Sequence, residues 1–145
     1  MKTSKKILSC LLAALMVCSA LLLGGCQKEV LVIKDSDTYI VIKTTQEAMG
    51  GKTDMLLIEY MQILQDKGQL DFKVVDGMIT SINGIDNPVD WSSCWMLYTS
   101  DETLANVAWG SVEYEGKTYG SAVSGAETLV IKADQLYIWV YKSFS

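Results

Sequence analysis

Hydrophobic and polar positions change period twice along this chain, from a strand pattern to a helical one and back. Tyr39 to Lys43 is rich in β-branched and aromatic residues, which predicts a strand. Apolar residues then recur at helical spacing and predict one helix from Asp54 to Lys67, with Thr53 as its N-cap. Gly68 stands where a helix commonly ends. The apolar face of this helix is wide, so we expect it to pack on a sheet.

The pattern after the helix is that of short strands joined by tight turns. Asp76-Gly77 and Glu115-Gly116 favour two-residue hairpin turns. Strands are expected at Leu70–Val75, Met78–Ile82 and Trp95–Thr99, around Tyr114 and Tyr119, and twice within 128–143, on either side of Ala133-Asp134-Gln135. One helix among many strands predicts an α+β fold, with a mixed sheet packed on that helix.

The first 25 residues carry the pattern of an export signal. "MKTSKK" supplies three lysines, Ile7 to Leu23 is a seventeen-residue apolar run, and "LGGC" ends at Cys26. This junction resembles the lipobox of bacterial lipoproteins. The resemblance implies cleavage before Cys26 and a thioether-linked diacylglycerol on its sulfur. An ordinary secretory signal and an uncleaved membrane helix are the alternatives, although a spanning helix needs about 20 apolar residues.

These features predict three parts for the chain. Residues 1–25 are a signal peptide, and 26–37 are a lipidated N-terminus in which Val30 to Ile33 is either a tether or a first strand. Residues 38–145 are one domain, with a membrane partner through the lipid on Cys26. The expected location is the outer face of the bacterial cell membrane.

The charge and composition exclude several classes of function. Removing 1–25 takes three of twelve lysines and none of seventeen acids, which leaves a net charge of about −8. The chain has no arginine and no histidine, so we expect no nucleic-acid partner, no histidine-based catalysis and no metal site. "GGKT" lacks the earlier glycine of a phosphate loop, because Gln46 stands there, and no cofactor is expected. Cys94 is expected to be buried and inert.

The tryptophans are the strongest candidates for a binding site. Trp95 and Trp139 fall within strands and are expected in the core. Trp91 and Trp109 lie in or beside polar loops, where binding a ligand and anchoring the loop are both open interpretations. The predicted ligand-binding residues are Asn83, Trp91, Trp95, Tyr98 and Trp109.

Three short motifs carry a family resemblance. "GMITSING", "CWMLYTSD" and the closing "LVIKADQLYIWVY" resemble, in order and spacing, the C-terminal domain of transcobalamin and intrinsic factor. The resemblance covers residues 38–141 and implies a β-grasp fold, in which a sheet embraces one helix. "YTSD" replaces the Asn-Gly that bacterial relatives usually carry there, and Ala133-Asp134 replaces their Gly-Asp. Both changes alter turn geometry and put loop-dependent binding in doubt.

The resemblance implies a function in binding and not in catalysis. The vitamin carriers close this domain and a helical domain over cobalamin, and the helical domain has no counterpart here. We therefore expect a lipoprotein that binds cobalamin or a related soluble ligand. A module that binds another cell-envelope protein, with no small-molecule ligand, is the alternative. A hydrolase using Glu113 and Glu115, expected to face the same side of a strand, is the third hypothesis.

Overall fold

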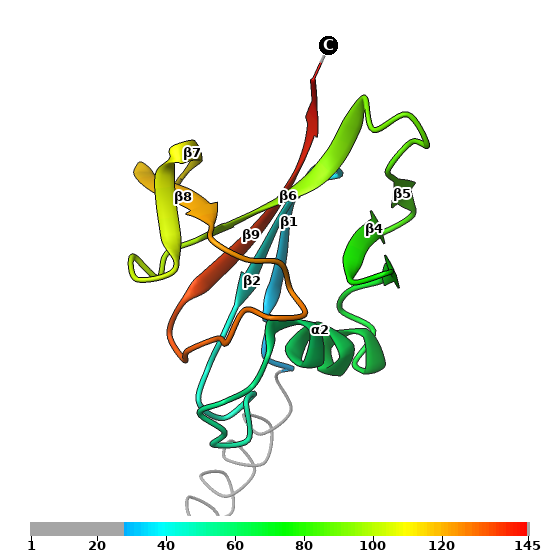
Figure 1. Cartoon of the computed structure of the whole chain (residues 1–145). Helices are drawn as coiled ribbons and strands as arrows, with labels where there is room; N and C mark the ends of the chain where they lie inside the picture. The colour runs from blue at the N-terminus through cyan, green and yellow to red at the C-terminus, as the bar shows by residue number, and fades with distance from the viewer. Residues whose placement is uncertain (1–27, 145) are drawn as a thin grey trace, which may run out of the picture.

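The structure is a computed structural model, and it describes residues 28–144. The predicted signal peptide, 1–25, and the predicted lipidation site, Cys26, lie outside these residues. Within 28–144 the chain forms an α+β fold of one helix and nine strands (Figure 1). The predicted class is confirmed at this level.

Six strands form a large sheet in which every paired neighbour runs antiparallel. Their spatial order is β1 (Val32–Ser36), β2 (Tyr39–Lys43), β9 (Leu136–Ser143), β6 (Ser93–Thr99), β8 (Lys117–Ala122) and β7 (Ala105–Tyr114). The expectation of a mixed sheet is therefore wrong. A parallel pair needs a crossover connection, and the helix α2 (Leu57–Asp66) leads instead into a separate sheet.

That second sheet is small and consists of three antiparallel strands. It contains β3 (Phe72–Val75), β4 (Met78–Ile82) and β5 (Ile85–Asp86). The turn between β3 and β4 has φ of 48° at Asp76 and 81° at Gly77, as a two-residue hairpin turn requires. Glu115 and Gly116, between β7 and β8, also have positive φ, at 49° and 74°. Both predicted hairpins are confirmed.

The helix begins later than the sequence predicts. Its N-cap is Leu56, whose backbone N–H donates to Glu59 Oε2 over 2.8 Å, and Thr53 lies outside it. The reason is a tertiary contact: the N–H of Leu57 donates to the carbonyl oxygen of Leu129 over 2.9 Å. This pairing lies beside Leu56, whose backbone is extended, with ψ of 152°, and not helical.

The other end of α2 agrees with the prediction. Gly68 follows the C-cap with φ of 70°, and its N–H donates to the carbonyl oxygen of Gln65. Gln69 N–H donates back to Leu64, which completes a Schellman motif. The four buried residues of the helix lie at helical spacing: Leu57, Tyr60, Met61 and Leu64.

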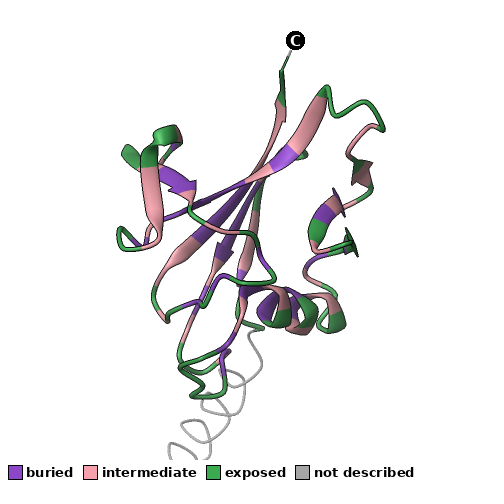
Figure 2. Cartoon of the chain, in the orientation of Figure 1, coloured by how far each residue is buried: buried purple, intermediate pink, exposed green. Residues whose placement is uncertain are grey.

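The large sheet has a hydrophobic cluster on each face, because successive strand residues point to opposite sides. Ile40, Trp95 and Trp139 belong to the larger cluster, together with the buried face of α2. The core positions predicted for both tryptophans are confirmed. On the other face, Tyr98 and Ile138 belong to a smaller cluster, against which β7 and β8 pack. Figure 2 shows the buried residues concentrated along the central strands and on one side of the helix.

The sheet curls around the smaller cluster, so that strands from distant places in its order meet. The Tyr39 hydroxyl on β2 donates to the carbonyl oxygen of Glu113 on β7 over 2.8 Å. The rings of Tyr39 and Tyr114 also stack, with centroids 6.3 Å apart. The tip of the β7–β8 hairpin is therefore attached to β2.

The start of the domain lies earlier than residue 38. β1 pairs with β2, so this part of the chain forms a first strand and is not a tether. Leu31 N–H donates to Gln69 Oε1 over 2.9 Å, and Gln69 Nε2 donates to the Glu29 carbonyl oxygen over 3.1 Å. Lys28 Nζ donates to the Lys67 carbonyl oxygen over 2.8 Å. The first described residues are thus attached to the end of α2.

The end of the chain supplies one strand where the sequence predicts two. Only β9 forms, and Val130 makes an isolated bridge with Leu56. Ile131 N–H donates to the Met55 carbonyl oxygen over 2.9 Å, so this segment covers the entry to the helix. Leu129 and Ile131 are buried because they close the core at this point, and their apolar character had suggested a strand.

Candidate functional site

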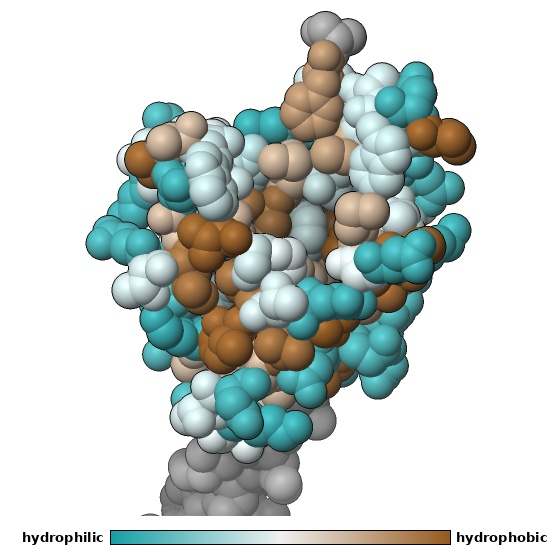
Figure 3. All heavy atoms as spheres, viewed as in Figure 1, coloured by the Kyte–Doolittle hydropathy of each residue, from teal (hydrophilic) through white to brown (hydrophobic). Residues whose placement is uncertain are grey.

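A hydrophobic cavity of about 270 Å³ opens beside β6 of the large sheet. It lies between β4, β6 and the segment 121–126, and its lining includes Trp91, Trp95 and Trp139. We call it the tryptophan groove. Figure 3 shows hydrophobic residues around a hollow between β4 and the segment that follows β8.

The groove exists because two strands separate. β8 pairs with β6 only at Tyr98–Ser121 and Thr99–Gly120, whereas β9 pairs with β6 along its whole length. Beyond Ser121 the chain no longer pairs with β6, although Ala122 still pairs with Ala105 of β7. This departure opens a wedge beside Met96 and Leu97, and both of these residues line the groove.

Asn87 fixes the opposite wall of the groove. Its Oδ1 accepts a hydrogen bond from Trp95 N–H over 3.1 Å, and its Nδ2 donates to the Ile79 carbonyl oxygen over 3.0 Å. One side chain therefore joins the small sheet to β6. Asn87 was not among the predicted site residues, because a loop asparagine beside a proline indicates only a turn.

Trp95 is held rigidly in this wall. Its Nε1 donates to the Ile85 carbonyl oxygen over 2.8 Å, and its ring meets Tyr141 edge-on at 5.4 Å. The Tyr141 hydroxyl donates to the Asp86 carbonyl oxygen over 3.0 Å. Trp95 is both a core residue, as predicted, and part of the groove lining.

Trp139 contributes an unused hydrogen-bond donor. Its side chain lines the groove and is only 4% exposed, yet its Nε1 has no partner among the described residues. A buried donor without a partner costs roughly 1–3 kcal/mol. The ring lines the groove, whereas the Nε1 atom itself is fully buried.

Trp91 stands at the mouth of the groove with 47% of its surface exposed. Its φ is 56°, a left-handed conformation that is unfavourable for a bulky residue. Asp90 braces the loop, since its Oδ1 accepts from both the N–H and the hydroxyl of Ser92, at 3.1 and 2.8 Å. These two hydrogen bonds lower the pKa of Asp90. The exposed ring is therefore presented by an ordered loop.

Two predicted site residues lie elsewhere in the fold. Tyr98 is buried on the opposite face of the sheet, where Lys142 Nζ lies 4.8 Å from its ring centre. Trp109 is 63% exposed on β7, where the register shifts between Asn106 and Ser111. It lines neither the groove nor the larger cavity described below.

Asn83 has a structural role that explains its position. Its φ is 47°, its Oδ1 accepts from Asp71 N–H over 3.0 Å, and its own N–H donates to the Asp71 carbonyl oxygen. Its side-chain oxygen is thus already used within the fold. Of the five predicted site residues, the structure brings Trp91 and Trp95 together at the groove.

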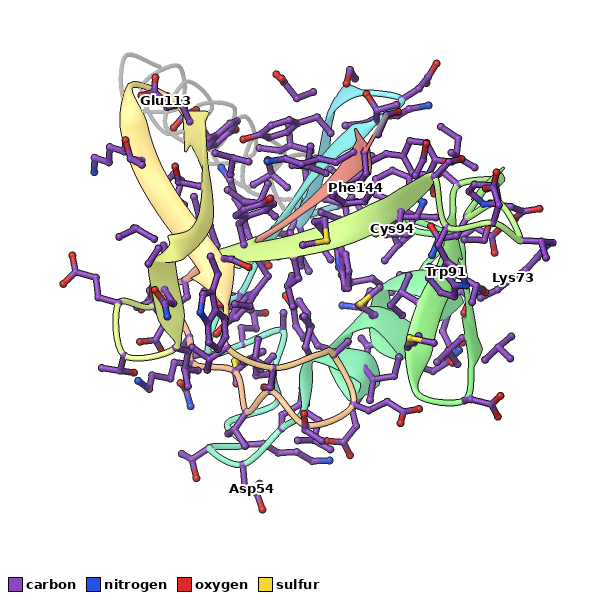
Figure 4. All side chains as sticks on the ribbon, turned by 45° about the horizontal axis from the view of Figure 1, so that its top comes forward. Asp54, Lys73, Trp91, Cys94, Glu113 and Phe144 are labelled. Carbon is purple, nitrogen blue, oxygen red and sulfur yellow. The ribbon has the colours of Figure 1, made fainter. Side chains whose placement is uncertain are left out.

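Cys94 lies in the groove lining and is only half-buried, so the expectation of a buried thiol is wrong. Burial nevertheless raises the pKa of the thiol, and its Sγ lies 3.6 Å from Met96 Sδ. Figure 4 shows Trp91 and Cys94 in the same region beside β6. The expectation of low reactivity remains a prediction.

A larger and more polar cavity, about 880 Å³, lies between the β7–β8 hairpin and the start of β9. Its lining contains no tryptophan. Two of its polar side chains are already paired, since Ser100 Oγ donates to Gln135 Oε1 over 2.6 Å. Its lining also includes Glu102, Lys117 and Asp134, which form no salt bridge among the described residues, so it differs from the tryptophan groove in being charged and in lacking tryptophan.

The carboxylates predicted for a hydrolase do not face each other across a cleft. Glu115 occupies the β7–β8 turn, so it does not alternate with Glu113 along a strand. Both side chains are exposed, and neither lines either cavity. Figure 4 shows Glu113 at the far end of the hairpin from Trp91. Over residues 28–144, no group of three or more Cys, Asp or Glu residues could hold a metal ion.

Comparison with known proteins leaves the family unassigned, because no family model, curated protein or solved structure matches this chain. In the described part of the chain, no helix has the length and apolar character needed to cross a bilayer.

Proposed function

We propose that this protein is a non-catalytic binding module and that the tryptophan groove is its ligand site. One observation carries the proposal: the groove is a concave site lined by three tryptophans, of which Trp91 stands exposed and strained at the mouth. Small-molecule sites are concave and are lined mainly by hydrophobic and aromatic side chains. Core packing does not require an exposed tryptophan in a strained backbone conformation.

We further propose that the module is exported and anchored by lipid on Cys26, at the outer face of the bacterial cell membrane. Support comes from the lysine-rich start, the apolar run and the cysteine that follows "LGG". Only Gln27 separates that cysteine from Lys28, the first described residue.

We also propose a β-grasp relationship to the C-terminal domain of transcobalamin and intrinsic factor. The motif order supports it, as does the single helix packed on a sheet. Cobalamin is then the first ligand to test. A corrinoid is much larger than the groove, so it would lie across the mouth, against Trp91, with one edge inserted.

The test is a titration of the purified protein with cobalamin and with cobinamide, followed by tryptophan fluorescence and checked by equilibrium dialysis. Saturable binding that Trp91→Ala weakens and Trp109→Ala leaves unchanged would support the groove and the corrinoid together. Absence of binding at millimolar ligand would remove corrinoids from the proposal. The matched control is Trp109, which is also an exposed tryptophan but lies outside the groove.

A second candidate function is binding of another envelope protein at the β7 edge of the large sheet. β7 is an edge strand, and Val107 and Trp109 are exposed on it. Exposed aromatic residues on an edge strand suit protein recognition. Purification from membranes should then yield one stoichiometric partner, which Trp109→Ala loses and Trp91→Ala retains.

A further inference from the structure

The lining of the tryptophan groove is entirely uncharged. Its aromatic residues are Trp91, Trp95 and Trp139, and the remaining lining residues are apolar, small or neutral polar. Three indole rings in a cavity of about 270 Å³ favour a compact ligand with an apolar body. A fragment-sized molecule fits this volume better than a corrinoid.

The charged residues that lie next to a lining residue in the sequence are all acidic. Asp76 precedes Gly77 of the lining, Asp90 precedes Trp91, and Glu127 follows Ala126. No lysine is adjacent in sequence to any lining residue. Asp86 is also adjacent, but Lys73 Nζ lies 3.9 Å from its Oδ1, so we do not count it as free.

Glu127 is in contact with the lining. A Cβ placed on Gly77 would lie 2.7 Å from Glu127 Oε2, which brings this carboxylate against the β3–β4 turn. No salt bridge engages Asp76, Asp90 or Glu127 among the described residues.

Lys142 is the register partner of Cys94 on β9, but its Nζ lies over the Tyr98 ring, which belongs to the cluster on the other face of the sheet. Glu127 is therefore the charged side chain in contact with the lining, while the interior of the groove is neutral and aromatic.

The Trp139 indole sets a requirement at the inner part of the groove. Its ring lines the groove but its Nε1 is buried out of reach of a molecule in the cavity, so the indole offers a ligand apolar and aromatic surface. A positive charge there would be buried without a partner. The rim, with the Glu127 carboxylate and the exposed Trp91 ring, is the place for positive charge.

We propose that the tryptophan groove binds a small organic cation. This ligand has an apolar body between the indole rings and a positive charge at the rim near Glu127 and Trp91. The inference rests on the proposed function, in which the groove is the ligand site. An extended peptide paired with β6 is a poorer fit, because Asn87 already accepts the Trp95 N–H on that edge.

The experiment compares probes of matched shape on the purified protein at low ionic strength. Benzoylcholine has a phenyl ring, an ester carbonyl and a quaternary ammonium, and 3,3-dimethylbutyl benzoate replaces only the charged nitrogen by carbon. We expect benzoylcholine to bind at least about threefold and up to about thirtyfold more tightly, as cation–π and carboxylate contacts predict. Hippurate, an anionic benzoyl compound, should bind most weakly.

Two variants separate the rim charge from the general acidity of the protein. Glu127→Gln should reduce the preference for benzoylcholine over its neutral isostere, whereas Glu113→Gln, an exposed acid at the far end of the hairpin, should leave it unchanged. Trp91→Ala should weaken both probes, and Trp109→Ala neither.

The outcomes distinguish the two proposals. If the neutral isostere binds as tightly as benzoylcholine and Trp91→Ala weakens it, the groove remains a ligand site and the cation inference is wrong. If Glu113→Gln and Glu127→Gln act equally, the preference reflects overall charge and the cation inference is also wrong. If no probe and no corrinoid binds, both the inference and the proposed ligand site fail.

Discussion

Asn87 Oδ1 accepts the backbone N–H of Trp95 over 3.1 Å, and this bond attaches the small sheet to the large one beside the groove. The same amide donates to the Ile79 carbonyl oxygen, so a single side chain satisfies polar groups on two sheets. The position of the small sheet, which forms one wall of the groove, depends on the Asn87 side chain. Asn87 therefore contributes both to the packing of the two sheets and to the shape of the candidate site.

Asn87→Ala should lower the free energy of unfolding by about 1–3 kcal/mol, because it leaves two part-buried backbone groups without partners. Urea denaturation measures this loss. Asn106→Ala is the matched control, since Asn106 Oδ1 accepts one exposed N–H from Ala108 and should cost less. Equal losses at the two sites would contradict the role assigned to Asn87.

The backbone conformation at Trp91 predicts that a glycine variant is more stable than an alanine variant at this position. A residue with a Cβ at φ of 56° bears a cost of roughly 1–2 kcal/mol that glycine avoids. Trp91→Gly should therefore be about 1 kcal/mol more stable than Trp91→Ala. At Val89, a fully exposed neighbour whose φ is not positive, the order should reverse because glycine gains more entropy on unfolding. The same order at both sites would show that Trp91 is not strained.

The buried carboxyl group of Asp101 should make stability depend on pH. Burial alone would raise its pKa, but Lys132 Nζ at 2.7 Å and two hydrogen bonds from Thr103 outweigh burial, so the pKa of Asp101 is lowered. Between that value and the usual value of about 4, the unfolded chain binds more protons. The contribution of Asp101 is thus present above about pH 4 and is lost as the pH falls through the folded pKa.

Lys132→Ala should cost about 1–2 kcal/mol at pH 7, because Asp101 Oδ2 then loses its partner. Urea denaturation at neutral and strongly acidic pH should show this difference shrinking as Asp101 becomes protonated. Lys34→Ala is the control, since Lys34 also pairs at 2.7 Å, with Asp37, but both side chains are largely exposed. A loss of stability in Lys132→Ala that does not change with pH would contradict this explanation.

The proposed lipidation can be tested by counting thiols. Removal of 1–25 eliminates Cys10 and Cys18, and a thioether on Cys26 leaves Cys94 as the single thiol of the mature chain. Denatured protein from membranes should take up one iodoacetamide, and its intact mass should include the diacylglycerol. Two reactive thiols would rule out the thioether.

The native thiol should also react slowly. Burial raises the pKa of Cys94, so less thiolate is present at neutral pH than in a free cysteine, and the alkylation rate should continue to rise at higher pH than usual. Because Cys94 lines the groove, a bound probe should slow alkylation further. A ligand that binds without protecting Cys94 would place the site elsewhere.

Local signals allowed much of the fold to be predicted from the sequence. The strand at Tyr39–Lys43 and the one at Met78–Ile82 have the bounds that composition and turn residues indicate. The turn at Asp76-Gly77 and the helix end at Gly68 also depend on neighbouring residues alone. Where a single dipeptide or one hydrophobic periodicity determines the backbone conformation, the sequence alone predicts the local structure.

The errors occurred where residues distant in sequence compete for the same backbone. Leu57 pairs with Leu129, which delays the helix, and Val130 is used for that closure instead of a strand. The groove depends on the point at which β8 leaves β6, and the segment 121–126 carries no motif that marks it. Tryptophan content pointed to Trp91, but only the fold places Trp139 beside it.

The attachment of Lys28, Glu29 and Leu31 to the end of α2 has a consequence for how the protein would stand on a membrane. Two residue steps separate Cys26 from Lys28, a reach of about 7 Å. A lipid on Cys26 would hold the end of α2 beside the bilayer, with almost no slack in the tether. The acidic domain would be repelled by anionic headgroups within about 10 Å, roughly one Debye length. The domain would stay close to the membrane on this short tether. Electrostatic repulsion from the headgroups, and not adhesion to them, would set its orientation.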